Sequence, residues 1–257
     1  MGCQRTQKAN ILRGPIIVPD ANLPSVVIFG ASGAIGAALC THYRENRWRV
    51  TAISREGLPG DRVDQNIDYR QWSLRESGSP SDSFPENINA IVWAQGANIS
   101  DDIFSYQPED FSTVFNANVL FIIETLHYLL KSDSLAEKCR MVVISSIWQE
   151  IARNSKLSYT VSKSALRGLV QSLAIDLADH GYQINAVLPG VLDTPMTQAN
   201  LTPDQINEIL KHTPGSQITS MAAVCEAVRF LTSEGSLGVN GQFLGVDGGF
   251  SRTFRAE

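Results

Sequence analysis

The segment Gly30-Ala31-Ser32-Gly33-Ala34-Ile35-Gly36 follows the apolar run Ser25–Phe29 and opens an amphipathic, helix-length stretch, Ala34–Asn46. A glycine-rich turn between a buried strand and a helix is the context that a dinucleotide site requires. Gly30 allows the tight turn, Gly36 lets the helix pack closely, and the helix N-terminus faces the pyrophosphate. A glycine turn alone also suits a structural loop, but its place after a buried-type strand favours the dinucleotide.

The alternation of strand-length and helix-length runs continues along the chain. The expected strands are Ser25–Phe29, Arg49–Ile53, Gln65–Asp68, Asn89–Ala94, Arg140–Ser145, Gln183–Leu188 and Gln242–Val246. The expected helices are Ala34–Asn46, Pro108–Lys131, Leu157–His180, Pro203–His212 and Met221–Thr232. Several strands are continuous apolar runs, as parallel strands covered on both faces are. The pattern predicts an α/β fold: a doubly wound, Rossmann-like parallel sheet of about seven strands with helices on both faces.

One dinucleotide-binding catalytic domain is expected over residues 24–257, after a flexible N-terminal arm at residues 1–23. The arm begins Met1-Gly2-Cys3-Gln4-Arg5-Thr6, which matches the N-myristoylation pattern, with Cys3 as a second acyl site. The match depends on Gly2 and Thr6 alone, and an unmodified terminus is the favoured interpretation.

The bulk composition excludes several classes of protein. The chain has 257 residues, 43% of them hydrophobic and 18% charged, which suits one compact domain. Its net charge of −5 argues against nucleic acid as a partner, because phosphate binding needs a basic face. No apolar run approaches the roughly 18 residues that cross a bilayer, and no secretory signal is visible, so we expect a cytoplasmic protein with no membrane partner. The four cysteines and four histidines are scattered, and no metal site is expected.

The end of the second strand indicates which dinucleotide binds. It reads Ala52-Ile53-Ser54-Arg55, with no acidic residue to accept the ribose 2′-hydroxyl of NAD. Ser54 and Arg55 offer a hydrogen bond and a cation to a 2′-phosphate, so NADP(H) is favoured and NAD(H) remains possible. Asp68, at the expected end of the third strand, is a candidate acceptor from the adenine amino group.

Tyr159 and Lys163 lie four residues apart in the stretch Leu157–His180, so both side chains can point into one cleft. A free phenol has a pKa of about 10. An ammonium about 4 Å away contributes at most about 4 kcal/mol at an effective dielectric of about 20, or about three pKa units. The spacing predicts that Lys163 brings the pKa of Tyr159 near neutrality, where a general acid–base works best. The alternative is a surface Tyr and Lys on an amphipathic helix.

Further motifs occur in order around this pair. They are Asn118 in Asn116-Ala-Asn-Val119, Ser145-Ser146, Asn185-Ala-Val-Leu-Pro-Gly190, Thr194 and Val246-Asp-Gly-Gly249. With the glycine turn and Tyr159-x-x-x-Lys163, the chain resembles the short-chain dehydrogenase/reductase family, in its branch of about 250 residues, from roughly Ser25 to Phe250. The resemblance implies NAD(P)-dependent interconversion of a carbonyl and an alcohol on a small or medium molecule.

The resemblance also implies roles for the catalytic residues. Tyr159 donates a proton to the substrate carbonyl as hydride arrives, and Ser146 hydrogen-bonds the same oxygen. Lys163 acidifies Tyr159 and holds the nicotinamide ribose, and Asn118 fixes a water that links Lys163 to solvent. The implied cofactor-binding residues are Gly30, Ser32, Gly33, Ala34, Ile35, Gly36, Ser54, Arg55, Asp68, Ala94, Gly96, Tyr159, Lys163, Pro189, Gly190, Val191 and Thr194.

The chain departs from the family at several positions. The family's Asn-Asn-Ala-Gly is here Trp93-Ala94-Gln95-Gly96, so the structural role of that motif is in doubt. Trp148 and Arg153 lie where family members line the substrate: Trp148 can stack on a ring or fill a gap, and Arg153 can meet an anionic group. Plain packing and surface roles are the alternatives. The stretch Leu192–Ser220 corresponds to the family's substrate lid.

Two other interpretations remain open. A non-catalytic, cofactor-binding regulator or scaffold of the same fold has no need of the full set Asn118, Ser146, Tyr159 and Lys163. The second interpretation is a related chemistry on the same fold, either enoyl reduction or sugar epimerisation. It is disfavoured because enoyl reductases of this fold space Tyr and Lys further apart than four residues, and sugar-nucleotide epimerases are usually longer.

The apolar faces of Pro108–Lys131 and Leu157–His180 pair across subunits in the family, so we expect a homotetramer, with a dimer as the next possibility.

Overall fold

The computed structural model describes residues 22–55, 64–71 and 84–252. Residues 1–21 of the expected arm, with Gly2 and Cys3, lie outside the described residues. The described strands form one parallel sheet in the order β3-β2-β1-β4-β5-β6-β7. They are β1 (Ser25–Phe29), β2 (Arg49–Ser54), β3 (Ile67–Gln71), β4 (Ile88–Trp93), β5 (Leu135–Ile144), β6 (Gln183–Pro189) and β7 (Phe243–Val246). The predicted doubly wound fold is confirmed.

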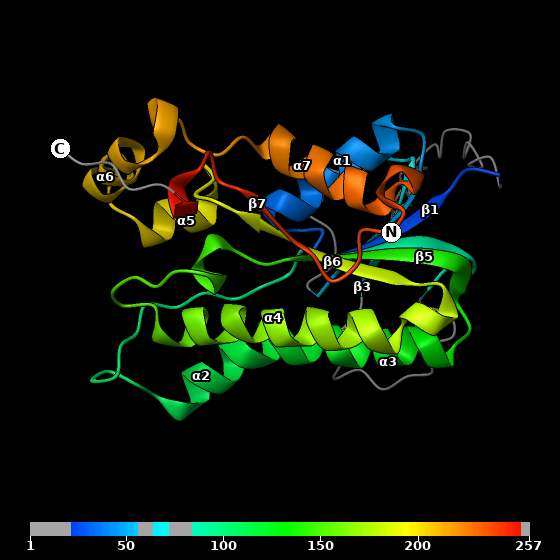
Figure 1. Ribbon diagram of the computed structural model, residues 1–257, viewed down its shortest axis with the longest axis horizontal. Helices are drawn as coiled ribbons and strands as arrows, with labels where there is room; N and C mark the ends of the chain where they lie inside the picture. The colour runs from blue at the N-terminus through cyan, green and yellow to red at the C-terminus, as the bar shows by residue number, and fades with distance from the viewer. Residues whose placement is uncertain (1–21, 56–63, 72–83, 253–257) are drawn as a thin grey trace, which may run out of the picture.

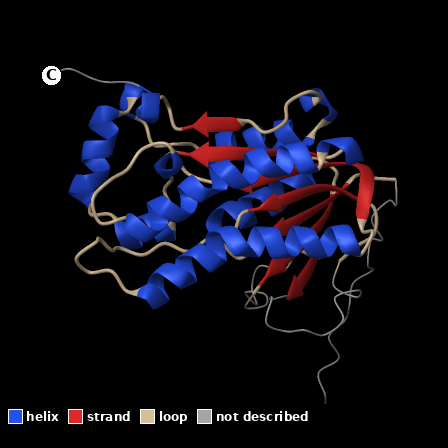
Figure 2. Ribbon diagram, turned by 60° about the horizontal axis from the view of Figure 1, so that its bottom comes forward, coloured by secondary structure: helices blue, strands red, loops and turns tan. Residues whose placement is uncertain are grey.

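Helices cover both faces of the sheet (Figures 1 and 2). On one face lie α1 (Ala34–Glu45) and α7 (Met221–Thr232), and on the other lie α2 (Pro108–Phe115), α3 (Phe121–Lys131) and α4 (Leu157–Asp176). Two short helices, α5 (Pro195–Asn200) and α6 (Pro203–His212), follow β6 and lie beyond one end of the sheet in Figure 1. A capping box of Thr202 and Gln205 starts α6.

Each central strand sends alternate side chains into two separate cores. On β1, Val27 and Phe29 pack with α3 and α4, whereas Val26 and Ile28 pack with α1 and α7. Both sets are fully buried, which explains why these strands read as continuous apolar runs. The sheet is therefore held from both sides, and its strand ends are fixed points for the residues that follow them.

The long helix expected at Pro108–Lys131 is interrupted. A π-helical turn, η2 (Asn116–Leu120), separates α2 from α3. Its residue Asn118 is 1% exposed and hydrogen-bonds the backbone after β4, which holds the turn out of regular α geometry. The expectation of one uninterrupted helix is wrong, because a tertiary hydrogen bond overrides the local preference.

Smaller boundary differences have similar causes. The third strand was expected at Gln65–Asp68 but runs from Ile67 to Gln71, because its register against β2 continues to Ser54. The helix α4 ends at Asp176, and the three residues before the left-handed Gly181 form a 3₁₀ turn. The strand β5 starts at Leu135, with a register shift opposite Ile88 and Ala90. The helix α5 was not expected.

One described helical stretch, Pro108–Lys131, meets the length and composition of a membrane span, with a mean hydropathy of 1.3 over its best window. This corrects the expectation that no apolar stretch approaches that length. Its apolar residues include Val114, Val119, Ile122 and Leu126, which are buried in the protein. The core helix of a folded domain passes the same test, so the absence of a membrane partner stays a prediction.

Candidate active site

A cavity of about 670 Å³ lies at the carboxyl ends of β1, β4, β5 and β6. The strand order reverses between β1 and β4, and ligands of doubly wound sheets bind at that point. The predicted site residues that line the cavity are Gly30, Ser32, Gly33, Ala34, Ile35, Ser54, Arg55, Ala94, Gly96, Ser146, Trp148, Arg153, Tyr159, Lys163, Pro189, Gly190, Val191 and Thr194. Three predicted residues do not line it: Gly36, Asp68 and Asn118.

The glycine turn has the shape that a dinucleotide needs. Gly30 has φ +78°, and a side chain there would overlap the backbone of Ala94 and Gln95. Gly36 lies beneath the turn, where a Cβ would overlap the Gly30 carbonyl, so its role is close packing of α1. No side chain caps the N-terminus of α1, and its first turn contains no acidic residue. The helix end therefore presents backbone N–H groups and positive potential to the cavity, which fits a pyrophosphate.

Ser54 and Arg55 follow the end of β2 at this same end of the cavity. Ser54 is buried and Arg55 is exposed, so a ligand can reach the guanidinium from solvent. Asp68 lies inside β3 rather than at its end, and its carboxylate pairs with Arg70 at 2.7 Å. The structure therefore does not bring Asp68 to the cavity with the other predicted cofactor residues.

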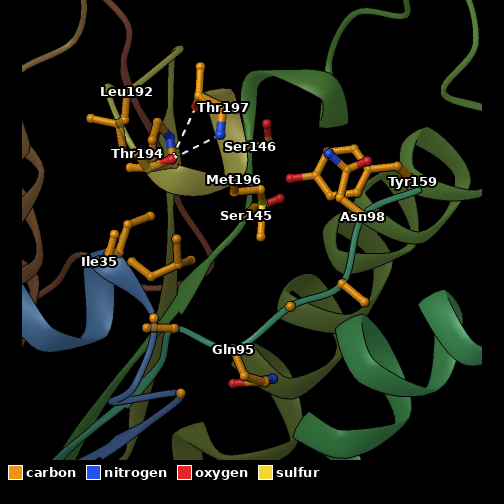
Figure 3. Close-up of a pocket in the computed structure, with 18 of the residues that line it drawn as sticks. Ile35, Gln95, Asn98, Ser145, Ser146, Tyr159, Leu192, Thr194, Met196 and Thr197 are labelled. Carbon is orange, nitrogen blue, oxygen red and sulfur yellow. Dashed lines mark hydrogen bonds between the residues drawn. The ribbon is translucent and has the colours of Figure 1, made fainter. Parts of the chain in front are cut away.

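Ser146, Tyr159 and Lys163 come together on the opposite wall. Ser146 follows β5, and α4 holds Tyr159 and Lys163. Figure 3 shows Tyr159 on one side of the view and Thr194 on the other, with Ser145, Ser146 and Met196 drawn between them. Both hydroxyl-bearing residues line the cavity; burial raises the pKa of the Tyr159 phenol, and the Ser146 side chain acts in the opposite direction. The four-residue spacing predicted that Tyr159 and Lys163 share a cleft, and the resemblance added Ser146; in the structure the end of β5 and one face of α4 place all three on the cavity wall.

The expected acidity of Tyr159 is wrong for the chain itself. Burial outweighs the Ser146 hydrogen bond and raises the pKa of Tyr159 to about 12. The Lys163 ammonium lies 5.7 Å from the Tyr159 ring centroid and donates to the Ile144 carbonyl at 3.0 Å. Its own burial lowers the pKa of Lys163 to about 8. The expected acidity took account of a nearby ammonium at an effective dielectric of about 20, but burial of the phenol has the larger effect on its pKa.

Asn118 lies directly behind the cavity wall. Its Oδ1 accepts from the Ala97 N–H at 2.8 Å, and its Nδ2 donates to the Ala97 carbonyl at 3.0 Å and to Ser162 Oγ at 2.9 Å. A Cβ at Gly96 would lie 3.0 Å from Asn118 Oδ1 and 3.7 Å from Lys163 Nζ. Asn118 thus holds the strand end beside Lys163, and its expected link to Lys163 through water stays a prediction.

The family departure at Trp93 is explained by packing. Trp93 is fully buried, its ring stacks on Phe29, and its Nε1 donates to Thr125 Oγ1 of α3 at 2.9 Å. The side chain points into the core between the sheet and α3, away from the cavity. Gly96 keeps the close passage that the family motif provides.

A clamp that the sequence did not reveal holds the loop after β4 against the start of α4. Lys156 Nζ donates to Asn98 Oδ1, the Ile99 carbonyl and Ser100 Oγ at 3.0–3.1 Å. The buried Asp101 accepts from the Ser158 N–H at 3.1 Å and from the Ser158 hydroxyl. Asp101 therefore supplies the N-terminal cap that α4 lacks locally, since its N-cap residue Lys156 makes no side-chain cap.

The segment after β6 closes the remaining side of the cavity. Thr194 caps the N-terminus of α5 by accepting from the Thr197 N–H at 3.2 Å (Figure 3). At Gly190, a Cβ would lie 2.9 Å from the backbone of Asp247, so only glycine fits. Among the described lining residues, those that sequence reasoning missed include Gln95, Asn98, Ser145, Lys156, Leu192, Met196 and Thr197. Several of these residues lie in loops, and Met196 and Thr197 lie in α5, which was not expected, so only the folded chain shows which side chains face the cavity.

Titratable clusters elsewhere do not suggest a metal centre. In residues 22–55, 64–71 and 84–252, no group of three or more His, Cys, Asp or Glu side chains is placed to hold a metal ion. Cys40, Cys139 and Cys225 are buried free thiols, and burial raises the pKa of Cys40 to about 12. The expectation of no resident metal stays a prediction.

Comparisons with known proteins agree with this geometry. A family model described as Enoyl-(Acyl carrier protein) reductase matches residues 82–251. The chain is 30% identical over 243 residues to the 2-(R)-hydroxypropyl-CoM dehydrogenase of Xanthobacter autotrophicus, covering 88% of this chain and 97% of that protein. It is 29% identical over 251 residues to a glucose 1-dehydrogenase of Gluconobacter oxydans, covering 88% and 91%. A gluconate 5-dehydrogenase structure from Burkholderia cenocepacia, with NADP and tartrate, shares the fold at a TM-score of 0.77 and 21% identity, covering 90% of this chain and 96% of that one.

Proposed function

Since the chain belongs to the short-chain dehydrogenase/reductase family and is an NAD(P)-dependent oxidoreductase acting on CH–OH or C=O groups of small molecules, we propose that it reduces a carbonyl with NADPH. The reverse reaction is oxidation of a secondary alcohol. Tyr159 is the general acid in reduction and the general base in oxidation. The observation that carries the proposal is that Ser146, Tyr159 and Lys163 line the same cavity as the glycine turn.

The residues around the glycine turn fit the cofactor. The uncapped N-terminus of α1 accepts the pyrophosphate, and Gly30 and Gly96 leave room for close backbone approach. Ser54 and Arg55 bind a 2′-phosphate, which favours NADPH over NADH. The NADP in the related gluconate 5-dehydrogenase structure supports the same preference. NADPH, when bound, supplies the hydride.

The chain's own residues orient and protonate the substrate. The Ser146 and Tyr159 hydroxyls converge on the carbonyl oxygen and polarise it. As negative charge develops there, Tyr159 donates its proton, and the nearby Lys163 ammonium stabilises the phenolate that remains. The raised pKa of Tyr159, about 12, keeps the phenol protonated and ready to donate throughout the neutral range. Thr194 and the segment after it shield the reaction from water.

The test is a spectrophotometric assay of NADPH and NADH oxidation with a panel of ketones, aldehydes, sugars, quinones and acyl thioesters. We expect turnover with at least one carbonyl and faster turnover with NADPH. Tyr159→Phe should lower kcat at least about 1,000-fold while the Kd for NADPH stays within about threefold, because only the donated proton is lost. Tyr182→Phe, outside the cavity, is the control. Normal turnover by Tyr159→Phe would overturn the mechanism.

Enoyl reduction is the second candidate, because the matching family model has that description. The spacing of four residues between Tyr159 and Lys163 favours carbonyl reduction. An α,β-unsaturated thioester in the same panel separates the two reactions, since its C=C absorbance disappears only in enoyl reduction. A non-catalytic regulator or scaffold is set aside because the relatives that match along 88% of the chain are enzymes.

The working assembly and location are also proposed. Exposed apolar side chains remain on η2, α3 and α4, among them Leu120, Ile123 and Val161. Pairing of these faces with a second copy gives a dimer, and two such dimers give a homotetramer. We propose a homotetramer in the cytoplasm.

A further inference from the structure

The cavity is lined by positively charged side chains, although the chain as a whole is negatively charged. The protein has 26 acidic and 21 basic residues and a net charge of −5. Yet the described lining residues include four cations and no Asp or Glu: Arg55, Arg153, Lys156 and Lys163. Arg55 and Lys163 are accounted for by the cofactor and by Tyr159. Arg153 and Lys156 are not, and they line the cavity from the segment between Ser146 and Tyr159.

Arg153 is built into the cavity wall. Its guanidinium carbon lies 5.8 Å from the centroid of the Trp148 ring, and that ring is braced edge-on by Phe250 at 6.4 Å. Stacking on an aromatic face fixes the guanidinium plane and leaves its N–H edge available for two parallel hydrogen bonds. In the described part of the chain, no carboxylate forms an ion pair with Arg153. Burial alone lowers the pKa of Arg153.

Lys156 contributes charge rather than donors. All three of its N–H groups are used by Asn98, Ile99 and Ser100. Burial is the main cause that lowers the pKa of Lys156. The charge of Arg153 lowers this pKa further, and the charge of Asp101 raises it. Of the acidic groups on the neighbouring elements, Asp101 offsets part of this positive charge, and Glu150 pairs with Arg167. The two cations therefore leave a net positive field at this end.

A planar guanidinium with a free edge matches the two oxygens of a carboxylate or phosphate. We infer that the substrate has an anionic group, a carboxylate or a phosphate, in addition to its carbonyl, and that Arg153 on the Trp148 ring binds this group. The inference rests on the proposed function, because Tyr159 and Ser146 must receive the carbonyl. Arg153 then decides substrate choice, and Lys156 positions the loop and adds to the field.

The experiment compares matched substrates that differ only in charge. The probes are 3-oxobutanoate, 4-oxopentanoate and 5-oxohexanoate, the methyl ester of each, and 3-oxobutyl phosphate. We expect wild-type kcat/KM for at least one anion to exceed that for its neutral partner about tenfold or more, through a lower KM. The carboxylate and phosphate arms show which anion the site takes.

Arg153→Gln should reduce this preference for the anion at least about tenfold, because it removes the charge and the fork. Arg167→Gln is the matched control: Arg167 also lies over an aromatic ring, Phe243 at 5.9 Å, but outside the cavity. The control should retain the preference. NADPH binding, followed by protein fluorescence, should be the same in both variants, and it shows that each is folded.

Equal rates for every anion and its ester in the wild type would overturn the inference while leaving carbonyl reduction intact. An unchanged preference in Arg153→Gln would do the same. Should Arg153→Gln fail to fold, Arg153→Lys keeps the charge without the fork, and an undiminished preference in that variant would also count against the inference. If no carbonyl compound in the panel supports NADPH oxidation, the proposed function is removed, and this inference is removed with it.

Discussion

At the scale of single residues, the main finding is how far burial changes the catalytic pair. The phenol of Tyr159 and the ammonium of Lys163 share one wall of the cavity, where burial disfavours both charged forms and moves their pKa values in opposite directions. The ammonium is the group that titrates near neutral pH. We therefore expect Lys163, rather than Tyr159, to set the pH dependence of the free protein.

The pH dependence follows from this order. With a pKa of about 8, Lys163 loses its proton as the pH rises through that value, whereas Tyr159, with a pKa of about 12, stays protonated. Reduction needs the ammonium to stabilise the phenolate, so kcat/KM should fall above about pH 8. In Lys163→Arg the guanidinium keeps its charge, and the falling limb should disappear although the rate is lower. The measurement is kcat/KM from pH 6 to 10; an identical limb in Lys163→Arg would assign it to another group.

Arg55 tests the choice of cofactor. Arg55→Glu replaces a cation at the end of β2 by an anion, which should repel a 2′-phosphate. We expect the Kd for NADPH to rise about tenfold to a hundredfold and that for NADH to change far less. Arg47→Glu is the control, because Arg47 is exposed and outside the cavity. Equal losses of NADPH and NADH affinity would contradict the assignment.

At the scale of elements, the site depends on how α4 is attached to the loop after β4. The strand ends are rigid because both faces of the sheet are buried, but Tyr159 lies near the start of a helix with no local side-chain cap. Asp101 and Lys156 supply that attachment from both directions. The clamp therefore sets the position of Tyr159 relative to Ser146.

Asp101→Ala should destabilise the protein, because two hydrogen-bond donors of Ser158 lose a charged acceptor in a buried place. We expect the free energy of unfolding to fall by about 2 kcal/mol. The measurement is urea denaturation at one fixed protein concentration. Asp102→Ala is the neighbouring control: Asp102 lies in an exposed turn and accepts from the Phe104 and Ser105 N–H groups, so its loss should cost less than the loss of Asp101. A larger loss in Asp102→Ala than in Asp101→Ala would contradict the clamp.

The elements were largely predictable from the sequence, and their attachments were not. The turn Gly30–Gly36 and the apolar strands are local patterns, so the fold and the cofactor end of the cavity followed from them. The clamp joins Asp101 to Ser158 across 57 positions, and no local pattern indicates such a pair. The acidity of Tyr159 was misjudged for a related reason, because burial is a property of the packed chain.

At the scale of the whole molecule, the exposed apolar residues remain to be explained. Val161 on α4 is 40% exposed and Ile123 on α3 is 41% exposed, beside helix faces that are otherwise packed. At the other side of the molecule, the outer strand β7 presents Leu244, which is 38% exposed. Two such surfaces are what a tetramer with two kinds of interface needs.

Val161→Glu combined with Ile123→Glu should dissociate the assembly, because each charge would be buried without a partner against a second copy. We expect sedimentation velocity to show a tetramer for the wild type and a dimer or monomer for the double variant. Thr41→Glu, an exposed change on α1, is the control and should leave the assembly intact. A wild-type monomer would remove the prediction.

The turn Asn116–Leu120 has a consequence for how the chain tolerates change. A π turn contains one residue more than the regular α-helix it replaces, and it absorbs that residue by widening. Removing Ala117 would thus let α2 run into α3 as one regular helix, but it would remove the widened turn that holds Asn118 against Ala97. The variant would be one residue shorter and locally more regular, but it would lose the contact that supports the cavity wall behind Lys163. The extra residue of this turn is therefore needed to place the side chains of the site.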